Sequence, residues 1–493
     1  MPKQQEDYYD ILGVLRDASQ EEIKRAYIQS AQRLHPDRNT VAGETELFLE
    51  VQQAYEVLSN PKRRANYDAT LPKEVDAPSI IQHEVLVSRP NLVRLREPQV
   101  IYLHLELAPR TQSEQIPAPP LNVCLVLDHS TSMKGEKMDV VKSATIQVMK
   151  SLRAQDVFSV VAFSDNAEVI IPSTLHLDRT KMEARIHLMQ PSGATEIFHG
   201  FEAGLAEIRQ NIDPLRVNHL ILLTDGHTYG DEQACLQLAE EAALQGIGMS
   251  CMGIGNDWND IFLDALASRT GGNCAYIAKP KDIQRLLLDK FKSFANVFAD
   301  DVILDFKAQP DVRVNYAFRL TPDGGPVTIE DSMHLGPILQ DTPLTILFEF
   351  FIEPSAVQNE LVTLLDGSLR PSITARPTPI PPIRLHITRD VRADAAFESP
   401  PSKILSSLSR LTLYRMQERA RSESEQGNYD SAAKHLKNLA THLLSQGEQH
   451  LANTVLFEAE NIKQIHTLSE EGSKQIKYGT RALLMAGSKE KVK

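Results

Sequence analysis

Apolar residues recur every three or four positions in two stretches near the N-terminus, and this spacing predicts two amphipathic helices. Ser19 and Glu22 form a capping box at the start of the first helix. That helix ends at Leu34, because Pro36 lacks an N–H and disfavours helix at the residue before it. The second helix starts near Thr45, so we expect an antiparallel hairpin. Its polar connecting loop displays His35, Pro36 and Asp37.

The middle of the chain has a different pattern, in which short apolar runs alternate with amphipathic helical stretches. The runs are Leu121–Leu127, Val157–Phe163, Val217–Leu223 and Gly248–Ile254, and the first helix follows from about Gly135. Runs that are mainly apolar, without a regular polar alternation, indicate strands buried on both faces. Their alternation with helices predicts a doubly wound parallel sheet, in which ligands bind at the carboxyl ends of the strands.

Both flanks of this segment contain further short strands with turn signals between them. The predicted strands are Ile80–Val87, Val100–Leu107, Val302–Lys307, Val312–Arg319, Leu344–Ile352, Leu361–Leu364 and Ile383–Thr388. Turns are expected at residues 322–325 and at Asp366-Gly367. We interpret the flanks as one discontinuous β-sandwich into which the parallel-sheet domain is inserted.

From Pro400 onward the spacing is again helical. Gly427, Tyr429 and Ala432 are similar to half a tetratricopeptide repeat. Since about one repeat is visible, the segment is interpreted as a packed helical hairpin, with a peptide-binding groove as the alternative. We expect residues 487–493 to be frayed.

At 493 residues the chain is long enough for three or four domains. The predicted fold is multidomain, with all-α, α/β and β-sandwich parts. The expected divisions are a helical hairpin at 1–70, a linker at 71–79, a β-sandwich at 80–120 plus 300–393, an α/β domain at 121–295 and an α-helical bundle at 394–493.

Composition and charge argue against several classes of function. The net charge of −13 argues against nucleic-acid binding, which requires excess Lys and Arg. No window reaches about 18 consecutive apolar residues, so no membrane span is expected. Residues 1–10 are polar and lack an apolar signal core. The four cysteines form no CxxC pair, so neither a zinc site nor a disulfide framework is expected, and a reducing cytoplasm fits best.

The N-terminal segment resembles the J domain of DnaJ-type co-chaperones. The resemblance rests on residues 8–14, 23–27, 35–39, 54–59 and 63–68 (Tyr-Tyr-Asp-Ile-Leu-Gly-Val, Ile-Lys-Arg-Ala-Tyr, His-Pro-Asp-Arg-Asn, Ala-Tyr-Glu-Val-Leu-Ser and Arg through Tyr-Asp). It implies docking on a DnaK-type chaperone and stimulation of its ATP hydrolysis. The implied contact residues are His35, Pro36 and Asp37, supported by Lys24, Arg25 and Arg38.

Two departures from that family affect the interpretation. Two further basic residues are usual after the Ala-Tyr pair, and here Ile28 and Gln29 stand there. Electrostatic steering towards a negative partner surface should therefore be weaker than usual. The glycine-rich linker and zinc repeats of full DnaJ proteins are absent, so a client would have to bind elsewhere in the chain.

Acidic and hydroxyl side chains follow the predicted parallel strands. Asp128 and Asp225 stand directly after two of them, Ser130 and Ser132 share the loop with Asp128, and Thr195 lies in another loop. Carboxylate and hydroxyl oxygens are hard ligands that suit Mg²⁺ or Mn²⁺ rather than Zn²⁺. Neutral hydroxyls leave the ion electron-poor, so an acidic group of a partner could complete its octahedron.

The Asp-x-Ser-x-Ser motif with the later Thr and Asp resembles the metal-ion-dependent adhesion site of von Willebrand factor A-type domains. The resemblance implies that Ser130, Ser132 and Thr195 ligate the ion directly, whereas Asp128 and Asp225 act largely through water. Thr131 replaces the glycine that usually separates the two serines, which stiffens the loop without changing a ligand.

The predicted function is that of a non-enzymatic co-chaperone whose A-type domain binds a protein client or complex. One alternative is an assembly scaffold in which the J domain is accessory. Another is a metal-dependent hydrolase with His129 as base to a loop serine, although neighbours on a tight loop rarely make such a pair. No GxSxG elbow or P-loop is present.

Overall fold

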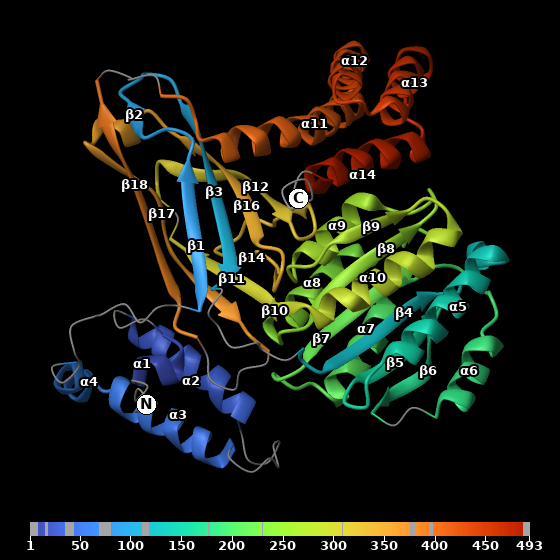
Figure 1. The fold of residues 1–493 in the computed structure, drawn as a ribbon, viewed down its shortest axis with the longest axis horizontal. Coiled ribbons are helices and arrows are strands. Elements are labelled where there is room, and N and C mark those ends of the chain that lie inside the picture. The colour runs from blue at the N-terminus through green and yellow to red at the C-terminus, as the bar shows by residue number, and fades with distance from the viewer. Residues whose placement is uncertain are drawn as a thin grey trace.

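The computed structural model describes residues 8–14, 18–34, 44–68, 80–110, 118–175, 178–228, 230–307, 309–374, 380–393 and 398–486. These residues form an N-terminal group of helices, a β-sandwich, an α/β domain and a C-terminal group of helices (Figure 1). The α/β domain lies beside the sandwich, and the C-terminal helices run along one end of both.

The N-terminal domain is a helical hairpin with two short flanking helices. Its helices are α1 (Tyr8–Leu12), α2 (Gln20–Leu34), α3 (Glu44–Leu58) and α4 (Pro61–Asp68). The predicted capping box is confirmed, because Ser19 N donates to Glu22 Oε2 at 2.6 Å and Glu22 N donates to Ser19 Oγ at 3.2 Å. Tyr27 of α2 stacks on Tyr55 of α3, with ring centroids 4.0 Å apart. His35, Pro36, Asp37 and Arg38 lie outside the described residues.

The β-sandwich draws strands from both sides of the α/β domain. Its elements are β1 (Ile81–Val87), β2 (Asn91–Val93), β3 (Gln99–Pro109), β10 (Val297–Ala299), β11 (Asp301–Phe306), β12 (Val312–Thr321), β13 (Gly325–Pro326), β14 (Ser332–His334), β15 (Ile338–Leu339), β16 (Leu344–Ile352), η3 (Ala356–Gln358), β17 (Leu361–Ser372) and β18 (Ile383–Arg392). The two five-stranded sheets have the orders β1-β3-β16-β12-β13 and β14-β11-β17-β18-β2. Since β3 pairs with β16 and β2 with β18, the sandwich is one discontinuous unit.

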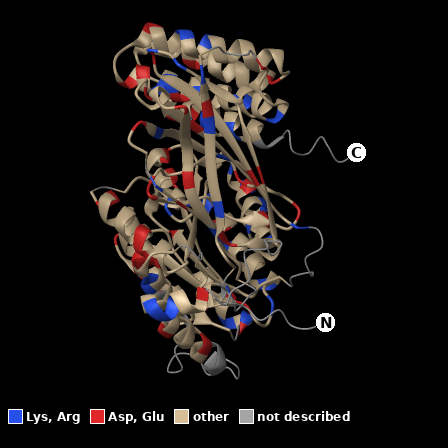
Figure 2. Ribbon diagram, turned by 90° about the vertical axis from the view of Figure 1, so that its left-hand side faces the viewer, with Lys and Arg blue, Asp and Glu red and all other residues tan. Residues whose placement is uncertain are grey.

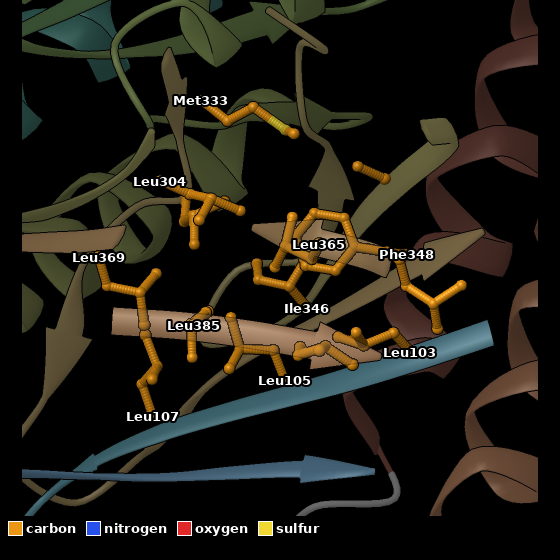
Figure 3. Close-up of a cluster of buried hydrophobic side chains, with 14 of the residues drawn as sticks. Leu103, Leu105, Leu107, Leu304, Met333, Ile346, Phe348, Leu365, Leu369 and Leu385 are labelled. Carbon is orange, nitrogen blue, oxygen red and sulfur yellow. The ribbon is translucent and has the colours of Figure 1, made fainter. Parts of the chain in front are cut away.

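The inner faces of these sheets supply the sandwich core. Alternate residues Leu103, Leu105 and Leu107 of β3 are buried, as the two-residue period of a strand requires. They face apolar side chains of the opposite sheet across the interior, among them Leu369 and Leu385 (Figure 3).

The turn predicted at Asp366-Gly367 is wrong, because both residues lie inside β17. A Cβ at Gly367 would lie 2.3 Å from the carbonyl oxygen of Asp305 on the neighbouring strand. The glycine therefore permits close approach of two backbones, which is the other common role of glycine within a strand.

The α/β domain contains a six-stranded sheet in the order β6-β5-β4-β7-β8-β9. The elements are β4 (Leu121–Asp128), η1 (Thr131–Met133), α5 (Glu136–Ser151), β5 (Val157–Phe163), β6 (Ala167–Thr174), α6 (Arg179–Leu188), α7 (Ile197–Gln210), β7 (Val217–Thr224), α8 (Glu232–Leu244), β8 (Gly248–Ile254), α9 (Asp260–Ser268), β9 (Cys274–Ile277), η2 (Pro280–Asp282) and α10 (Ile283–Ala295). Helices α5, α6 and α10 contribute to the core on one face, and α7, α8 and α9 to that on the other. The sheet is not wholly parallel as predicted, because edge strand β6 pairs antiparallel with β5.

A buried arginine, Arg319, links the sandwich to the α/β domain. Arg319 of β12 donates from Nη1 to Gly271 O at 2.7 Å and from Nη2 to Gly272 O at 2.6 Å. Its Nη1 also donates to Leu335 O at 3.0 Å within the sandwich. The guanidinium therefore satisfies carbonyl groups that this domain boundary would otherwise leave buried without a donor.

The C-terminal domain consists of α11 (Ser402–Glu425), α12 (Tyr429–Ser445), α13 (Gln449–Ile465) and α14 (Glu470–Ala486). Gly427 and Gly447, at φ of +83° and +84°, follow α11 and α12, where a left-handed residue commonly ends a helix. Ala432 of α12 and Ala452 of α13 are fully buried in the core of this domain, where their small side chains leave room for neighbouring helices. The predicted linker at 71–79 and tail at 487–493 lie outside the described residues.

Acidic and basic residues are interspersed along the whole ribbon (Figure 2). Among the helices that the structure describes, none combines the length and the apolar character needed to cross a bilayer. All four cysteines are buried as free thiols.

Candidate metal centre

The centre lies at the carboxyl ends of β4 and β7, which are neighbours in the parallel part of the sheet. Asp128 is the last residue of β4, and Asp225 directly follows β7. Because parallel strands end at the same edge, the register brings both carboxyl groups to one place. Both residues are almost completely buried.

The hydroxyl groups of Ser130 and Ser132 lie next to these carboxyl groups. Ser132 Oγ donates to Asp225 Oδ1 at 2.6 Å and lies 2.9 Å from Ser130 Oγ. Ser130 N donates to Asp128 Oδ1 at 2.8 Å, which fixes the start of the loop. Since Ser132 is exposed, solvent reaches the centre from the hydroxyl side.

Thr195 comes from the loop before α7 and lies against the residue that follows Asp225. A Cβ at Gly226 would lie 2.8 Å from Thr195 Oγ1, so only glycine leaves room for this hydroxyl. The loop is held on its other side, where Thr131 Oγ1 donates to Gly193 O at 2.9 Å. The structure therefore brings together the five residues predicted from the sequence, Asp128, Ser130, Ser132, Thr195 and Asp225.

The electrostatics of the centre favour a cation. Burial raises the pKa of Asp128, and repulsion from Asp225 raises it further, whereas hydrogen bonds from Ser130 and Thr224 lower it. Thr224, a residue that the sequence reading missed, donates from Oγ1 to Asp128 Oδ2 at 2.6 Å. Two shielded carboxylates that repel each other are stabilised by a positive charge between or beside them.

A second missed residue provides such a charge. Lys137, in the first turn of α5, places Nζ 2.5 Å from Asp225 Oδ2. The ammonium group therefore supplies a positive charge at one side of the centre. The oxygen donor set of two carboxylates and three hydroxyls fits Mg²⁺ or Mn²⁺, which prefer hard ligands.

The geometry gives no support to a serine nucleophile. His129 Nδ1 lies 3.0 Å from Gln190 O, which positions the ring on the backbone of a neighbouring loop. The hydroxyl of Ser132 donates to a carboxylate of the centre, and that of Ser130 contacts Ser132. A nucleophile needs a base within hydrogen-bond reach, and His129 makes its contact elsewhere.

On the N-terminal domain, the structure describes only part of the predicted chaperone-binding surface. Lys24 and Arg25 are exposed on α2, the helix that precedes residues 35–43 in the chain. Ile28, which replaces a usual basic residue, is 43% exposed on the same helix. An apolar side chain thus stands on this surface where the resemblance would place a charge.

Known families match three segments of the chain. The DnaJ domain matches residues 7–68, the von Willebrand factor type A domain residues 122–288, and the Sll0103-like, C-terminal alpha-helical domain residues 402–486. The chain therefore contains a DnaJ domain and a von Willebrand factor type A domain, hereafter the VWA domain.

Two relatives illustrate these matches. "Uncharacterized protein sll0103" of Synechocystis is 28% identical over 243 residues, which cover 48% of this chain and 58% of that protein. "Chaperone protein DnaJ" of Cyanothece is 60% identical over 62 residues, 13% of this chain and 17% of that protein. The chain thus spans less than two thirds of either relative.

Solved structures share the fold beyond the VWA domain. "von Willebrand factor type A from Catenulispora acidiphila" has a TM-score of 0.63 at 15% identity, covering 82% of this chain and 98% of that one. The ArnB paralog VWA2 from Sulfolobus acidocaldarius has a TM-score of 0.51 at 14% identity, covering 83% and 99%. At these coverages the likeness includes much of the sandwich and helical domains.

Proposed function

We propose that this protein is a J-domain co-chaperone whose VWA domain binds a protein client or complex through a divalent cation. The observation that carries the proposal is the union, in one chain, of a DnaJ domain and an oxygen-lined centre suited to Mg²⁺ or Mn²⁺. Free buried cysteines are consistent with action in a reducing cytoplasm.

The J domain would recruit a DnaK-type chaperone and stimulate its ATP hydrolysis. His35, Pro36 and Asp37 would dock on that chaperone, with Lys24, Arg25 and Arg38 as supporting charges. The exposed positions of Lys24 and Arg25 support this role. The uncharged Ile28 favours a partner that relies less on electrostatic steering than usual.

The VWA domain would select what the chaperone acts on. Ser130, Ser132 and Thr195 would hold the cation directly, and Asp128 and Asp225 would hold it through water. An ion bound by neutral hydroxyls retains affinity for a further anionic ligand, so a carboxylate of the client is the expected contact.

ATP turnover by a purified DnaK-type chaperone tests the first half of the proposal. Addition of the full-length protein should accelerate turnover, and His35→Gln or Asp37→Asn should remove the acceleration. The matched control is Asp430→Asn, an exposed aspartate of α12 that should leave stimulation unchanged. Absence of stimulation, or equal stimulation by all variants, contradicts the co-chaperone role.

Calorimetry with Mn²⁺ tests the second half. The wild type should bind one ion, Asp128→Ala should abolish binding, and Asp289→Ala on the exposed face of α10 should not change it. In pull-downs with the same variants, Asp128→Ala should lose every partner except the chaperone. Partners that persist when the divalent ion is chelated would show that the centre is not the docking surface.

An assembly scaffold is the second candidate, and the attachment of the C-terminal domain favours it. Lys477 and Arg481 of α14 form buried ion pairs with α9 of the VWA domain, so the two domains present one joined surface. In that case the J domain would only adjust the turnover of an assembly. Partners that bind equally well to Asp128→Ala but not to a variant with α14 detached would support the scaffold.

A further inference from the structure

Lys137 reaches the metal centre from the surface of the VWA domain. Its Nζ lies 2.5 Å from Asp225 Oδ2, while the other carboxylate oxygen accepts a hydrogen bond from Ser132. The Asp225 side chain is fully buried, whereas that of Lys137 is 29% exposed. The lysine side chain is therefore partly open to solvent, while its ammonium group contacts a buried residue of the centre.

Helix stability does not account for a lysine at this position. Helix α5 begins at Glu136, and its N-terminal end carries partial positive charge from the unpaired backbone N–H groups. Acidic residues suit that end, and Glu136 and Asp139 supply them. A basic residue in the first turn is unfavourable for the helix itself, so its contact with Asp225 is the interaction that offsets this cost.

We propose that Lys137 is the built-in counter-ion of the centre, holding Asp225 until a divalent cation displaces it. The inference rests on the proposed metal site and names the residue that regulates its loading. An ammonium in contact with Asp225 repels a divalent ion that approaches the same carboxylate. Loading therefore requires release of Lys137, and the affinity of the centre for metal is lower than its oxygen ligands alone would give.

The surroundings of Lys137 allow this release without a backbone rearrangement. A Cβ at Gly255 would lie 3.9 Å from Nζ, so the lysine passes beside a residue without a side chain. The loop around Gly255 is fixed by Trp258, whose Nε1 donates to Gly255 O at 2.8 Å, and by Lys474, whose Nζ donates to Asn256 O at 2.6 Å. Rotation of the partly exposed Lys137 side chain towards solvent then breaks its contact with Asp225 and a long hydrogen bond of 3.5 Å to Ser132 O.

Removal of the charge then has two opposite consequences. The metal-free protein loses the partner of a buried carboxylate and becomes less stable. The metal-bound protein loses a repulsive charge and holds its ion more tightly. A residue that served only to stabilise the fold would produce the first effect without the second.

Two variants and a control test the proposal in the full-length protein. Lys137→Met keeps the length of the side chain and removes its charge, whereas Lys137→Arg keeps the charge. The control is Lys134→Met, which removes an exposed lysine three positions earlier, in the loop before α5. Titration calorimetry with Mn²⁺ gives the affinity, and the melting temperature is measured with and without Mn²⁺.

We expect Lys137→Met to bind Mn²⁺ roughly tenfold more tightly than wild type, the effect of about 1.4 kcal/mol, and to melt at a lower temperature without the ion. Lys137→Arg and Lys134→Met should bind within about twofold of wild type. If Lys137→Met binds Mn²⁺ with the same affinity as the wild type, or more weakly, the role of Lys137 is wrong, but the proposed metal site is not affected. Absence of Mn²⁺ binding in every variant overturns the metal site itself.

Discussion

Arg481 of α14 and Asp264 of α9 form a two-pronged buried ion pair between the C-terminal domain and the VWA domain. The Nη1–Oδ1 and Nη2–Oδ2 distances are both 2.8 Å, across 217 residues of sequence. Lys477 adds contacts to Asp264 at 2.7 Å and to Asp260 at 2.5 Å. The C-terminal helices are thus attached to the VWA domain by charges that solvent hardly reaches.

The first prediction concerns this attachment. Asp264→Leu leaves Arg481 and part of the Lys477 interaction without a buried partner, which should lower the free energy of unfolding by about 3–5 kcal/mol. Trp258, the one tryptophan of the chain, lies with its ring centroid 5.9 Å from that of Tyr478 on α14. Its fluorescence during urea unfolding therefore reports on this interface.

An exposed pair within the C-terminal domain provides the control. Glu460→Ala removes the partner of Lys437, in a pair separated by 3.8 Å and about half exposed, and should cost less than about 1 kcal/mol. Combining Asp264→Leu with Arg481→Leu should recover part of the lost stability, because one fewer charge is then left without a partner. Equal effects of Asp264→Leu and Glu460→Ala would contradict the assignment.

The strands that are easiest to predict from the sequence are those buried on both faces along their whole length. Strands β4, β5 and β7 are buried along their whole length, so their sequences are mainly apolar and do not alternate with exposed polar residues. Strand β6 lies at the sheet edge with only two fully buried residues, and its mixed sequence gave no signal. Gly367 was misread because a glycine beside an aspartate is typical both of a turn and of a close approach between strands.

In the candidate centre, too, some residues could be predicted from the sequence and others could not. Its five oxygen-bearing residues were predicted because their spacing within loops is a local property of the sequence. Lys137 was missed because its meaning depends on how α5 is placed against β7. A basic residue in the first turn of a helix was the only available sign. Arg481 and Asp264 had no local signal at all.

The second prediction is a loss of stability in acid caused by Asp260. Burial alone would raise the pKa of Asp260, but Lys477 and Arg421 outweigh it and hold the pKa well below the ordinary value. Its charged form therefore stabilises the fold at neutral pH, and this contribution is lost as pH falls below about 4, the pKa expected in the unfolded chain. Asp260→Asn should be less stable than wild type at pH 7, with the difference shrinking towards pH 3 in urea unfolding. A constant difference would rule out this titration.

The third prediction concerns Asp300, whose contribution to stability changes with pH in the opposite direction to that of Asp260. Burial, reinforced by neighbouring Asp301, raises the pKa of Asp300 to about 6. The folded state binds this proton more tightly than the unfolded chain, so the contribution is fully present below about pH 4 and is lost as pH rises through 6. Asp300→Asn keeps the shape of the side chain without its charge. It should match wild type at pH 4 and be more stable by up to about 3 kcal/mol at pH 8.

The control for that experiment is internal. His334 lies 2.5 Å from Asp301, and against the effect of burial its pKa is raised by its hydrogen bond to that carboxylate, but it is present in both proteins. Its contribution therefore cancels in the difference between Asp300→Asn and wild type. A difference that is already present at pH 4 would assign the effect to packing rather than to the carboxyl proton.

The last prediction tests the junction between the sandwich and the VWA domain at Gly336. This glycine has φ of +104°, and a Cβ there would lie 2.2 Å from Nη1 of Arg319. Because that nitrogen donates to Gly271 O and Leu335 O, Gly336→Ala forces the guanidinium off buried carbonyl groups. Gly336→Ala should therefore be more destabilising than backbone strain alone would make it.

Gly427→Ala is the matched control, since Gly427 has φ of +83° but open space where a Cβ would lie. Backbone strain alone should cost about 1–2 kcal/mol at Gly427. Gly336→Ala should cost about 2 kcal/mol more in thermal or urea unfolding, the penalty of leaving a buried acceptor without its donor. Equal losses in the two variants would show that Arg319 yields without giving up its carbonyl partners.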